Sequence, residues 1–140
     1  MSNRLLTVIP FKPEHLHAIK PKAIHNGEIP RTIQTEAVTV MDGPTPMAIF
    51  GMFVFVPGVL HIWALVSDDV YRKPIAFFKV VRNLLDFYED RTKPRRVQMD
   101  VKAGHPELQK FAEALGFEHE GTMKRYGANG EDFHLYGRTR

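Results

Sequence analysis

The sequence contains no cysteine among its 140 residues. A disulfide framework, a thiolate nucleophile and a cysteine-ligated zinc ion are therefore excluded. Long apolar runs are also missing, because the longest one, Met47–Val66, is interrupted by Gly51, Pro57, Gly58 and His61. A membrane-spanning helix needs about 20 consecutive apolar residues. We therefore expect no membrane partner and a cytoplasmic location.

Several motifs of common enzyme classes are absent as well. There is no Gly-x-Ser-x-Gly sequence, no Walker loop and no pair of carboxylates at a spacing typical of a catalytic site. Nothing therefore supports a hydrolase or a nucleotidase. The seven histidines are scattered, and His15 and His17 are two residues apart, so they do not share one helical face. Because a metal site needs ligands that converge, we predict no bound metal ion.

The net charge is mildly positive, at +3. Basic residues gather at Arg91–Arg96 and at Lys124 and Arg125. Such a segment is either a solvated connection or a contact for phosphate groups and acidic partners. No basic motif is interleaved with aromatic residues, so we expect no nucleic-acid partner. The length and the hydrophobic content of 44% predict one globular domain over residues 1–140.

The most informative stretch joins a strand to a helix. Leu60–Val66 is a short, nearly continuous apolar run, which is typical of a strand buried on both faces. Polar residues Ser67–Asp69 end it, and they are candidates for helix capping. Pro74 then suits the first turn of a helix, whose apolar residues recur at helical spacing through Tyr88. A strand, a polar loop and a helix in this order aim a helix N-terminus at an anionic ligand.

The remaining elements follow from local patterns. Asn26 and Gly27 are a strong stop, and Glu28–Thr35 shows no clear pattern. Gly51 lies inside a predicted strand, which suggests a bulge or a close backbone approach. We predict strands at Leu5–Ile9, Glu36–Val40, Met47–Val56, Leu60–Val66, Arg96–Val101, Phe117–Tyr126 and Glu131–Tyr136, with helices at Lys12–His25 (interrupted at Pro21), Pro74–Tyr88 and Pro106–Ala114. This order predicts a mixed α/β sheet with a central antiparallel meander, closed by a hairpin whose Asn129-Gly130 favours positive φ.

The element order and two stretches resemble the Gcn5-related N-acetyltransferase (GNAT) family. The stretches are Val101–His105, followed by a helix, and Leu115–Gly121, which begins Leu-Gly-Phe and leads to the last hairpin. The resemblance implies a sheet flanked by helices, with a V-shaped splay between the fourth and fifth predicted strands, Leu60–Val66 and Arg96–Val101. The compact sequence resembles the divergent phage-encoded branch in particular, which implies the host cytoplasm or a virion as its location.

The resemblance also implies a site for acetyl-CoA. The family signature, Gln/Arg-x-x-Gly-x-Gly/Ala, corresponds to Tyr71–Ala76, where Tyr71 and Pro74 replace the first polar residue and the first glycine. Proline removes one N–H donor from the place where such proteins hold pyrophosphate, and nearby side-chain charge can compensate. The residues that the resemblance assigns to acetyl-CoA are Ala64, Leu65, Val66, Tyr71, Arg72, Lys73, Ile75 and Ala76.

Two residues are candidates for proton transfer. His61 lies in the strand that lines the acceptor cleft in this family, and an imidazole titrates near the operating pH, so it is the candidate base. Tyr136, on the last hairpin, is the candidate proton donor. The alternatives are a histidine at the edge of the core and a packed or exposed tyrosine. Family members often carry a tyrosine five residues before the phenylalanine of Leu-Gly-Phe, and Ala112 occupies that position here.

Two hypotheses follow. In the first, a primary amine attacks the thioester of acetyl-CoA directly, and backbone N–H groups of Ile62–Val66 support the carbonyl oxygen. In the second, the protein is a catalytically silent binding or assembly module with the same fold, for example in a virion. Free N–H groups at Leu65 and Val66 would favour the enzyme, and a cleft filled by Trp63, Phe77 or Tyr71 would favour the module.

The acceptor amine stays open at this point. Peptide N-termini, lysine, polyamines and aminoglycosides all fit the sequence equally. The exposed edge of the last hairpin makes a homodimer a further hypothesis.

Overall fold

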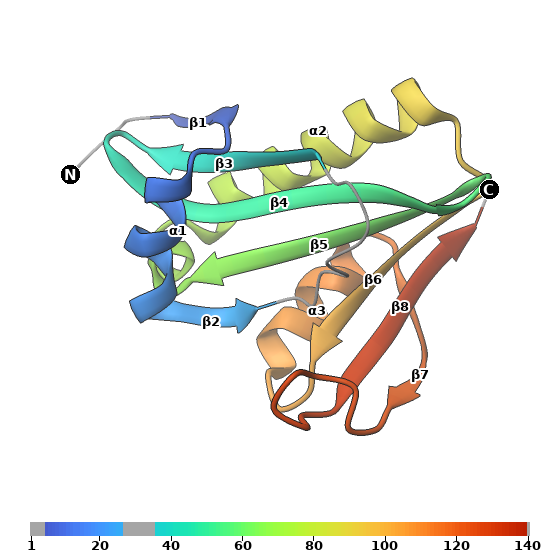
Figure 1. The fold of residues 1–140 in the computed structure, drawn as a ribbon. Helices are drawn as coiled ribbons and strands as arrows, with labels where there is room; N and C mark the ends of the chain where they lie inside the picture. Colours follow the sequence, from blue (N-terminus) through green and yellow to red (C-terminus); the bar gives the residue numbers. More distant parts are fainter. Residues whose placement is uncertain (1–4, 27–35, 140) are drawn as a thin grey trace.

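The protein is described by a computed structural model that covers residues 5–26 and 36–139 (Figure 1). The first half holds two short helices and most of the strands, and the second half alternates strands with longer helices. The elements are β1 (Leu6–Pro10), α1 (Pro13–Ile19), the 3-10 helix η1 (Lys20–Lys22), β2 (Ala23–Asn26), β3 (Glu36–Asp42), β4 (Thr45–Val56), β5 (Val59–Ser67), the 3-10 helix η2 (Asp68–Arg72), α2 (Pro74–Thr92), β6 (Arg96–Lys102), α3 (Pro106–Ala114), β7 (Glu118–Met123) and β8 (Phe133–Thr139).

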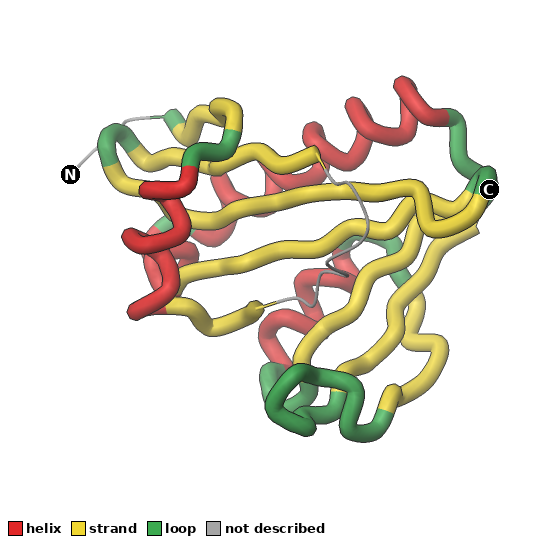
Figure 2. Tube along the Cα trace, viewed as in Figure 1, coloured by secondary structure: helices red, strands yellow, loops and turns green. Residues whose placement is uncertain are grey.

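The strands form one mixed sheet in the order β1-β3-β4-β5-β6-β8-β7, with β2 paired to β5 off this path. Among the described strands, only β5 and β6 run parallel, because α2 crosses over between them, and the other pairings are antiparallel. The predicted mixed α/β fold with a central meander is therefore confirmed. Figure 2 shows the helices lying against the sheet, with α1 near β4 and β5 at one end.

The core lies on both faces of β5, as its continuous apolar run predicts. Ile62 and Val66 pack in the larger cluster with residues of α2 and α3. Trp63 and Leu65 point to the opposite face, where they pack with Ile19 of α1 and with β4. Because successive residues of a strand point to opposite faces, this alternation places α1 on one side of the sheet and α2 with α3 on the other.

Helix α2 forms where the apolar spacing predicts it and extends past Tyr88 to Thr92. Pro74 occupies its first turn, where no backbone N–H is needed. Its buried residues follow helical spacing: Phe77, Val81, Leu85, Tyr88 and Glu89. The helix ends at Lys93, whose φ of 49° lies in the left-handed region typical of a helix end.

The predicted splay separates β5 from β6. The two strands pair only from Val59 to Ile62, opposite Arg96 to Met99. Beyond Ile62 they diverge, and Figure 1 shows the gap widening between the two arrows. The V-shaped sheet of the predicted fold class is thereby confirmed.

The predicted end of the first helix was wrong. The first helix does not reach His25: α1 ends at Ile19, Pro21 lies in η1, and Ala23–Asn26 is the strand β2. Pro21 cannot continue the hydrogen-bonding of a helix interior, and the edge of β5 provides a partner for the extended segment. The stretch Glu28–Thr35, for which the sequence shows no clear pattern, lies outside the described residues.

The last hairpin also differs from its prediction. β7 is shorter than its predicted strand, and β8 begins and ends later than predicted. The two strands are joined by a longer connection, in which Gly130 has φ of 83° and Asn129 does not have positive φ. The backbone N–H of Arg125 donates to Asp132, and the N–H of Gly127 donates to the carbonyl of Glu131. These bonds shape a loop rather than a two-residue Asn-Gly turn.

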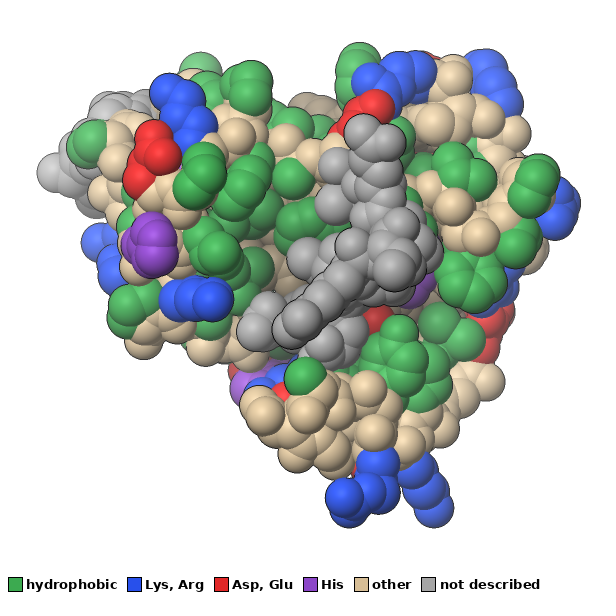
Figure 3. Space-filling view, in the orientation of Figure 1, with side chains coloured by type: hydrophobic (Ala, Val, Ile, Leu, Met, Phe, Trp, Pro, Cys, Tyr) green, Lys and Arg blue, Asp and Glu red, His purple; other side chains and the backbone are tan. Residues whose placement is uncertain are grey.

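The surface gives two further findings. Within residues 5–26 and 36–139, no helix has the length and apolar character needed to cross a membrane. On the face seen in Figure 3, lysine and arginine side chains are spread around the rim and do not gather in one patch.

Candidate active site

The outer edge of β5 is covered by two different strands. β6 pairs with it up to Ile62, and β2 pairs with it from Leu65, since Asn26 is opposite Leu65 and His25 is opposite Val66. Trp63 and Ala64 lie between the two pairings. Leu65 and Val66 therefore do not form the open strand edge, with free N–H groups, that would favour the enzyme hypothesis.

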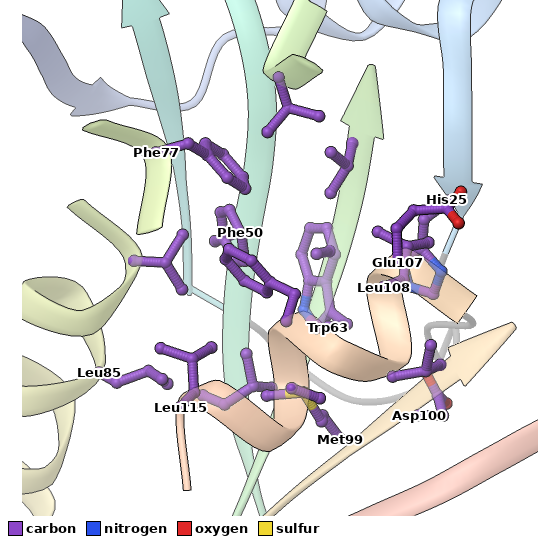
Figure 4. Close-up of a pocket in the computed structure, with 18 of the residues that line it drawn as sticks. His25, Phe50, Trp63, Phe77, Leu85, Met99, Asp100, Glu107, Leu108 and Leu115 are labelled. Carbon is purple, nitrogen blue, oxygen red and sulfur yellow. The ribbon is translucent and has the colours of Figure 1, made fainter. Parts of the chain in front are cut away.

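A pocket of about 220 Å³ opens beside this short interval of β5. Its walls come from β2, β4, β5, β6, η2, α2 and α3, and Trp63 and Ala64 belong to its lining. Trp63, Phe77 and Tyr71 line the pocket without filling it. Figure 4 shows two unlike ends: Phe77 and Leu85 lie toward α2, whereas the polar groups lie on the opposite side. These polar groups belong to His25, Asp100 and Glu107.

Trp63 is held by the glycine opposite it. Gly51 of β4 is the cross-strand partner of Trp63, and a Cβ at Gly51 would lie 2.2 Å from two carbons of the indole ring. The indole therefore lies directly over the backbone of β4. The prediction at Gly51 was a bulge or a close backbone approach, and what the glycine accommodates is instead the side chain of Trp63.

Asp100 is the buried acid of the site. Its exposed fraction is 3%, and neither carboxyl oxygen has a hydrogen-bond partner among the residues that the structure describes. The nearest basic group is His61, whose Nε2 lies 3.8 Å from Oδ2, beyond the usual hydrogen-bond range. A buried polar group without a partner is costly, so Asp100 is available to a ligand.

His61, the predicted base, lies behind Asp100 rather than in the pocket lining. Its ring stacks on Phe53 with 4.9 Å between centroids, and Nδ1 lies 3.1 Å from the amide nitrogen of Gln98. An amide nitrogen only donates, so Nδ1 accepts and the proton of the neutral ring is on Nε2. This proton faces Asp100. His61 is therefore the basic group that faces this carboxyl group, at 3.8 Å and without a hydrogen bond to it.

His25 enters the same end of the pocket from β2. Burial lowers its pKa from 6.5 to about 4; the negative charge of Asp100 opposes this change, and His105 and Lys102 add to it. The imidazole is therefore neutral at neutral pH. Its Nδ1 is buried and has no hydrogen-bond partner within the described part of the chain. The pocket end thus holds one carboxyl group and one neutral, unpaired imidazole.

Tyr71 and Glu107 line the pocket at its exposed side. The hydroxyl of Tyr71 donates to Oε1 of Glu107 at 3.0 Å, which joins η2 to the first turn of α3. Partial desolvation, followed by this hydrogen bond, raises the pKa of Tyr71. The pKa of Glu107 is lowered by its own backbone N–H first and by Tyr71 second.

The basic residues assigned to acetyl-CoA have acidic partners. Arg72 lies 2.7 Å from Asp69, which also contacts Lys22 at 3.0 Å. Lys73 lies 3.0 Å from Asp42. Both positive charges at the N-terminus of α2 are therefore compensated within the chain.

The rest of the predicted cofactor set divides between the pocket and the surface. Ala64, Val66 and Tyr71 line the pocket, Leu65 packs on the opposite face of the sheet, and Ile75 is exposed. Ala76 is half-buried. The capping predicted for Ser67 is confirmed, since its hydroxyl oxygen accepts from the N–H of Asp69.

Tyr136, the predicted proton donor, is completely buried on β8. Its hydroxyl accepts from Gln109 of α3 at 3.4 Å, and it is not among the pocket-lining residues. Ala112, which occupies the position of the family's tyrosine, is buried in α3 and lines the pocket.

Sequence reasoning did not select Asp100, His25 or Glu107 for the site. Asp100 occupies a polar position of an alternating strand, so no local signal distinguishes it from a solvent-facing residue. The described residues contain no group of three or more His, Asp and Glu side chains able to hold a metal ion together.

The fold and its splayed sheet are those of the N-acetyltransferases. The chain is similar in structure to ribosomal-protein-S5-alanine acetyltransferase from Vibrio fischeri, with a TM-score of 0.73 and 15% identity over 99% of this chain and 95% of the other. It is also similar to a GCN5-related N-acetyltransferase from Kribbella flavida, with a TM-score of 0.69 and 16% identity over 97% and 98%.

A spermidine N-acetyltransferase from Vibrio cholerae matches with a TM-score of 0.72 and 10% identity over 96% of this chain and 93% of the other. No family model matches the sequence, and no curated protein matches it. The likeness therefore lies in the fold.

Proposed function

We propose that this protein is an acetyl-CoA-dependent N-acetyltransferase that acts on a primary amine. The observation that carries the proposal is the pocket beside Trp63 and Ala64, which reaches the splay of the sheet and ends at Asp100. In an acetyltransferase the thioester and the amine must meet at one point that excludes water. The splay is the place in this fold where a buried acid and a pocket coincide.

The reaction follows from these groups. The amine nitrogen attacks the thioester carbon, a C–N bond forms, the C–S bond breaks, and the CoA thiolate takes up a proton as it leaves. We assign acceptance of the amine proton to Asp100, which borders the pocket, and assign His61 the positioning of that carboxyl group. Tyr71, Arg72 and Lys73 remain the residues proposed to meet the phosphates of acetyl-CoA.

A second candidate function is a catalytically silent binding or assembly protein, in a virion or elsewhere. The observation that favours it is β2, which pairs with β5 at Leu65 and Val66. A cosubstrate that lies along β5 would need this edge. The paired charges of Arg72 and Lys73 and the missing N–H of Pro74 favour the same candidate.

Titration calorimetry with acetyl-CoA distinguishes the two candidates. For the enzyme we expect micromolar binding, together with release of free CoA thiol when an amine is added. Lys73→Met should weaken acetyl-CoA binding about tenfold, since an ion pair with phosphate is lost. Methionine keeps the length of the side chain and avoids the repulsion with Asp42 that an acidic replacement would create.

Lys124→Met is the matched control. Lys124 is exposed and lies in the connection between β7 and β8, so acetyl-CoA binding should keep its wild-type strength. Absence of heat up to millimolar acetyl-CoA, from a sample with a folded circular-dichroism spectrum, would refute the transferase and leave the binding protein.

A further inference from the structure

The pocket is chemically asymmetric in a way that selects its ligand. Its apolar end is formed by side chains such as Phe50, Phe77 and Leu85, while the opposite end presents Asp100 and His25 (Figure 4). A ligand that fills both ends needs an apolar body and one polar head. The volume of about 220 Å³ lies below the roughly 300–1,000 Å³ of pockets for drug-sized molecules, so this ligand is small.

The polar head must be a donor. Asp100 is almost completely buried, and both of its carboxyl oxygens lack a partner among the described residues. His61 stands too far from it for a hydrogen bond, at 3.8 Å. His25 is uncharged near neutral pH, because burial lowers its pKa to about 4. Among the described residues that line the pocket, there is therefore no cation that compensates this carboxyl group.

The number of charges on the ligand is also limited. Besides Asp100, the only acid that lines the pocket within the described ranges is Glu107, which is exposed and already accepts the hydroxyl of Tyr71. An ion pair at such an exposed position contributes little. A second ammonium group placed between Phe50 and Phe77 would lose its hydration without a partner.

We infer that the pocket binds a small monoamine, with one primary ammonium group at Asp100 and an uncharged aromatic or aliphatic body between Phe50 and Phe77. The inference rests on the proposed function only in making this amine the acetyl acceptor. It narrows the acceptor class, because polyamines, which the structurally similar spermidine acetyltransferase is named for, and aminoglycosides carry several charges.

Tryptophan fluorescence tests the inference without acetyl-CoA. Trp63 is the single tryptophan of the sequence and lines the pocket, so its emission reports occupancy directly. The probes are 2-phenylethylamine, its neutral analogue 2-phenylethanol, and spermidine. We expect saturable binding of 2-phenylethylamine, about tenfold to a hundredfold tighter than binding of the alcohol, since a charged hydrogen bond is lost in the alcohol. Spermidine should bind more weakly than 2-phenylethylamine.

Asp100→Asn keeps the shape of the side chain and removes its charge. It should remove the preference for the amine and leave binding of the alcohol within about twofold of the wild type. Asp86→Asn is the matched control, because Asp86 is exposed on α2 and does not line the pocket; its binding should be unchanged. If Asp100→Asn does not fold, the relative affinities of the three probes for the wild-type protein still test the inference.

Equal binding of amine and alcohol would overturn the inference, as would tighter binding of spermidine or no binding of any probe up to millimolar concentration. The proposed function fails separately. If 2-phenylethylamine binds as expected but the protein transfers no acetyl group to it, the monoamine site stands and the transferase does not. If spermidine is acetylated efficiently while 2-phenylethylamine neither binds nor reacts, the transferase stands and the monoamine site does not.

Discussion

His25 makes the stability of the protein depend on pH in a predictable direction. Burial lowers the pKa of this imidazole from 6.5 to about 4 in the folded state. Below pH 6.5 the imidazole of His25 takes up a proton in the unfolded chain but stays neutral in the folded chain. The free energy of unfolding therefore decreases as the pH falls. The loss begins near pH 6.5 and is complete below about pH 4.

The magnitude follows from the size of the pKa change. Each pKa unit corresponds to about 1.4 kcal/mol, so the wild type should lose about 3 kcal/mol between pH 7 and pH 4 through this group alone. That amount is a large part of the 5–15 kcal/mol that is roughly typical of a domain. The groups whose charges act on His25 are Asp100, His105 and Lys102, and each of them stays in place in a variant that changes only His25.

Urea denaturation at pH 7 and pH 4 measures the effect, with His25→Gln as the test variant. Because every other titrating group is shared, the difference between the two pH dependences isolates His25, and the variant should lose about 3 kcal/mol less than the wild type. His17→Gln, at an exposed position on α1, serves as control and should follow the wild type. Parallel pH dependences for wild type and His25→Gln, or an NMR titration of His25 centred near pH 6.5, would refute the reasoning.

Two further predictions concern packing and a buried ion pair. Gly51→Ala should destabilise the fold by about 1–3 kcal/mol, because the new methyl group overlaps the indole of Trp63; urea denaturation gives the loss, and an unchanged Trp63 emission spectrum would contradict the mechanism. Glu89→Gln should cost about 2 kcal/mol or more, since the buried carboxylate of Glu89 receives Nε and Nη2 of Arg138 at 3.2 and 2.7 Å; a thermal melt that matches the wild type would show that this pair contributes nothing.

The elements that the sequence predicts well are those fixed by local patterns. The helix at Pro106–Ala114 has the predicted bounds, because Pro106 suits its first turn and Gly116 follows its end with φ of 91°. The strand around Ile62 is recognisable because an apolar run of this length and composition is buried wherever it is placed. The splay could be expected only through the family resemblance, since it is a property of two strands that are distant in the chain.

The parts that the sequence does not predict depend on distant partners. Ala23–Asn26 has no strand pattern of its own and becomes a strand because the edge of β5 is available. Asp100 follows Met99 in an alternating strand, where a polar residue normally indicates the solvent-facing side. Its burial beside His61 depends on tertiary packing, so local reasoning selects the histidine and overlooks the acid.

The position of β2 has a consequence for any ligand that would join the sheet. A segment of the same chain competes for an edge at a high effective concentration, about millimolar for short connections. Only the three residues of η1 separate β2 from α1, which is packed against the sheet through Ile19. A peptide or cosubstrate that adds to β5 as an extra strand must therefore displace β2. The short connection through η1 sets the effective concentration of β2, and a ligand must bind β5 tightly enough to exceed it.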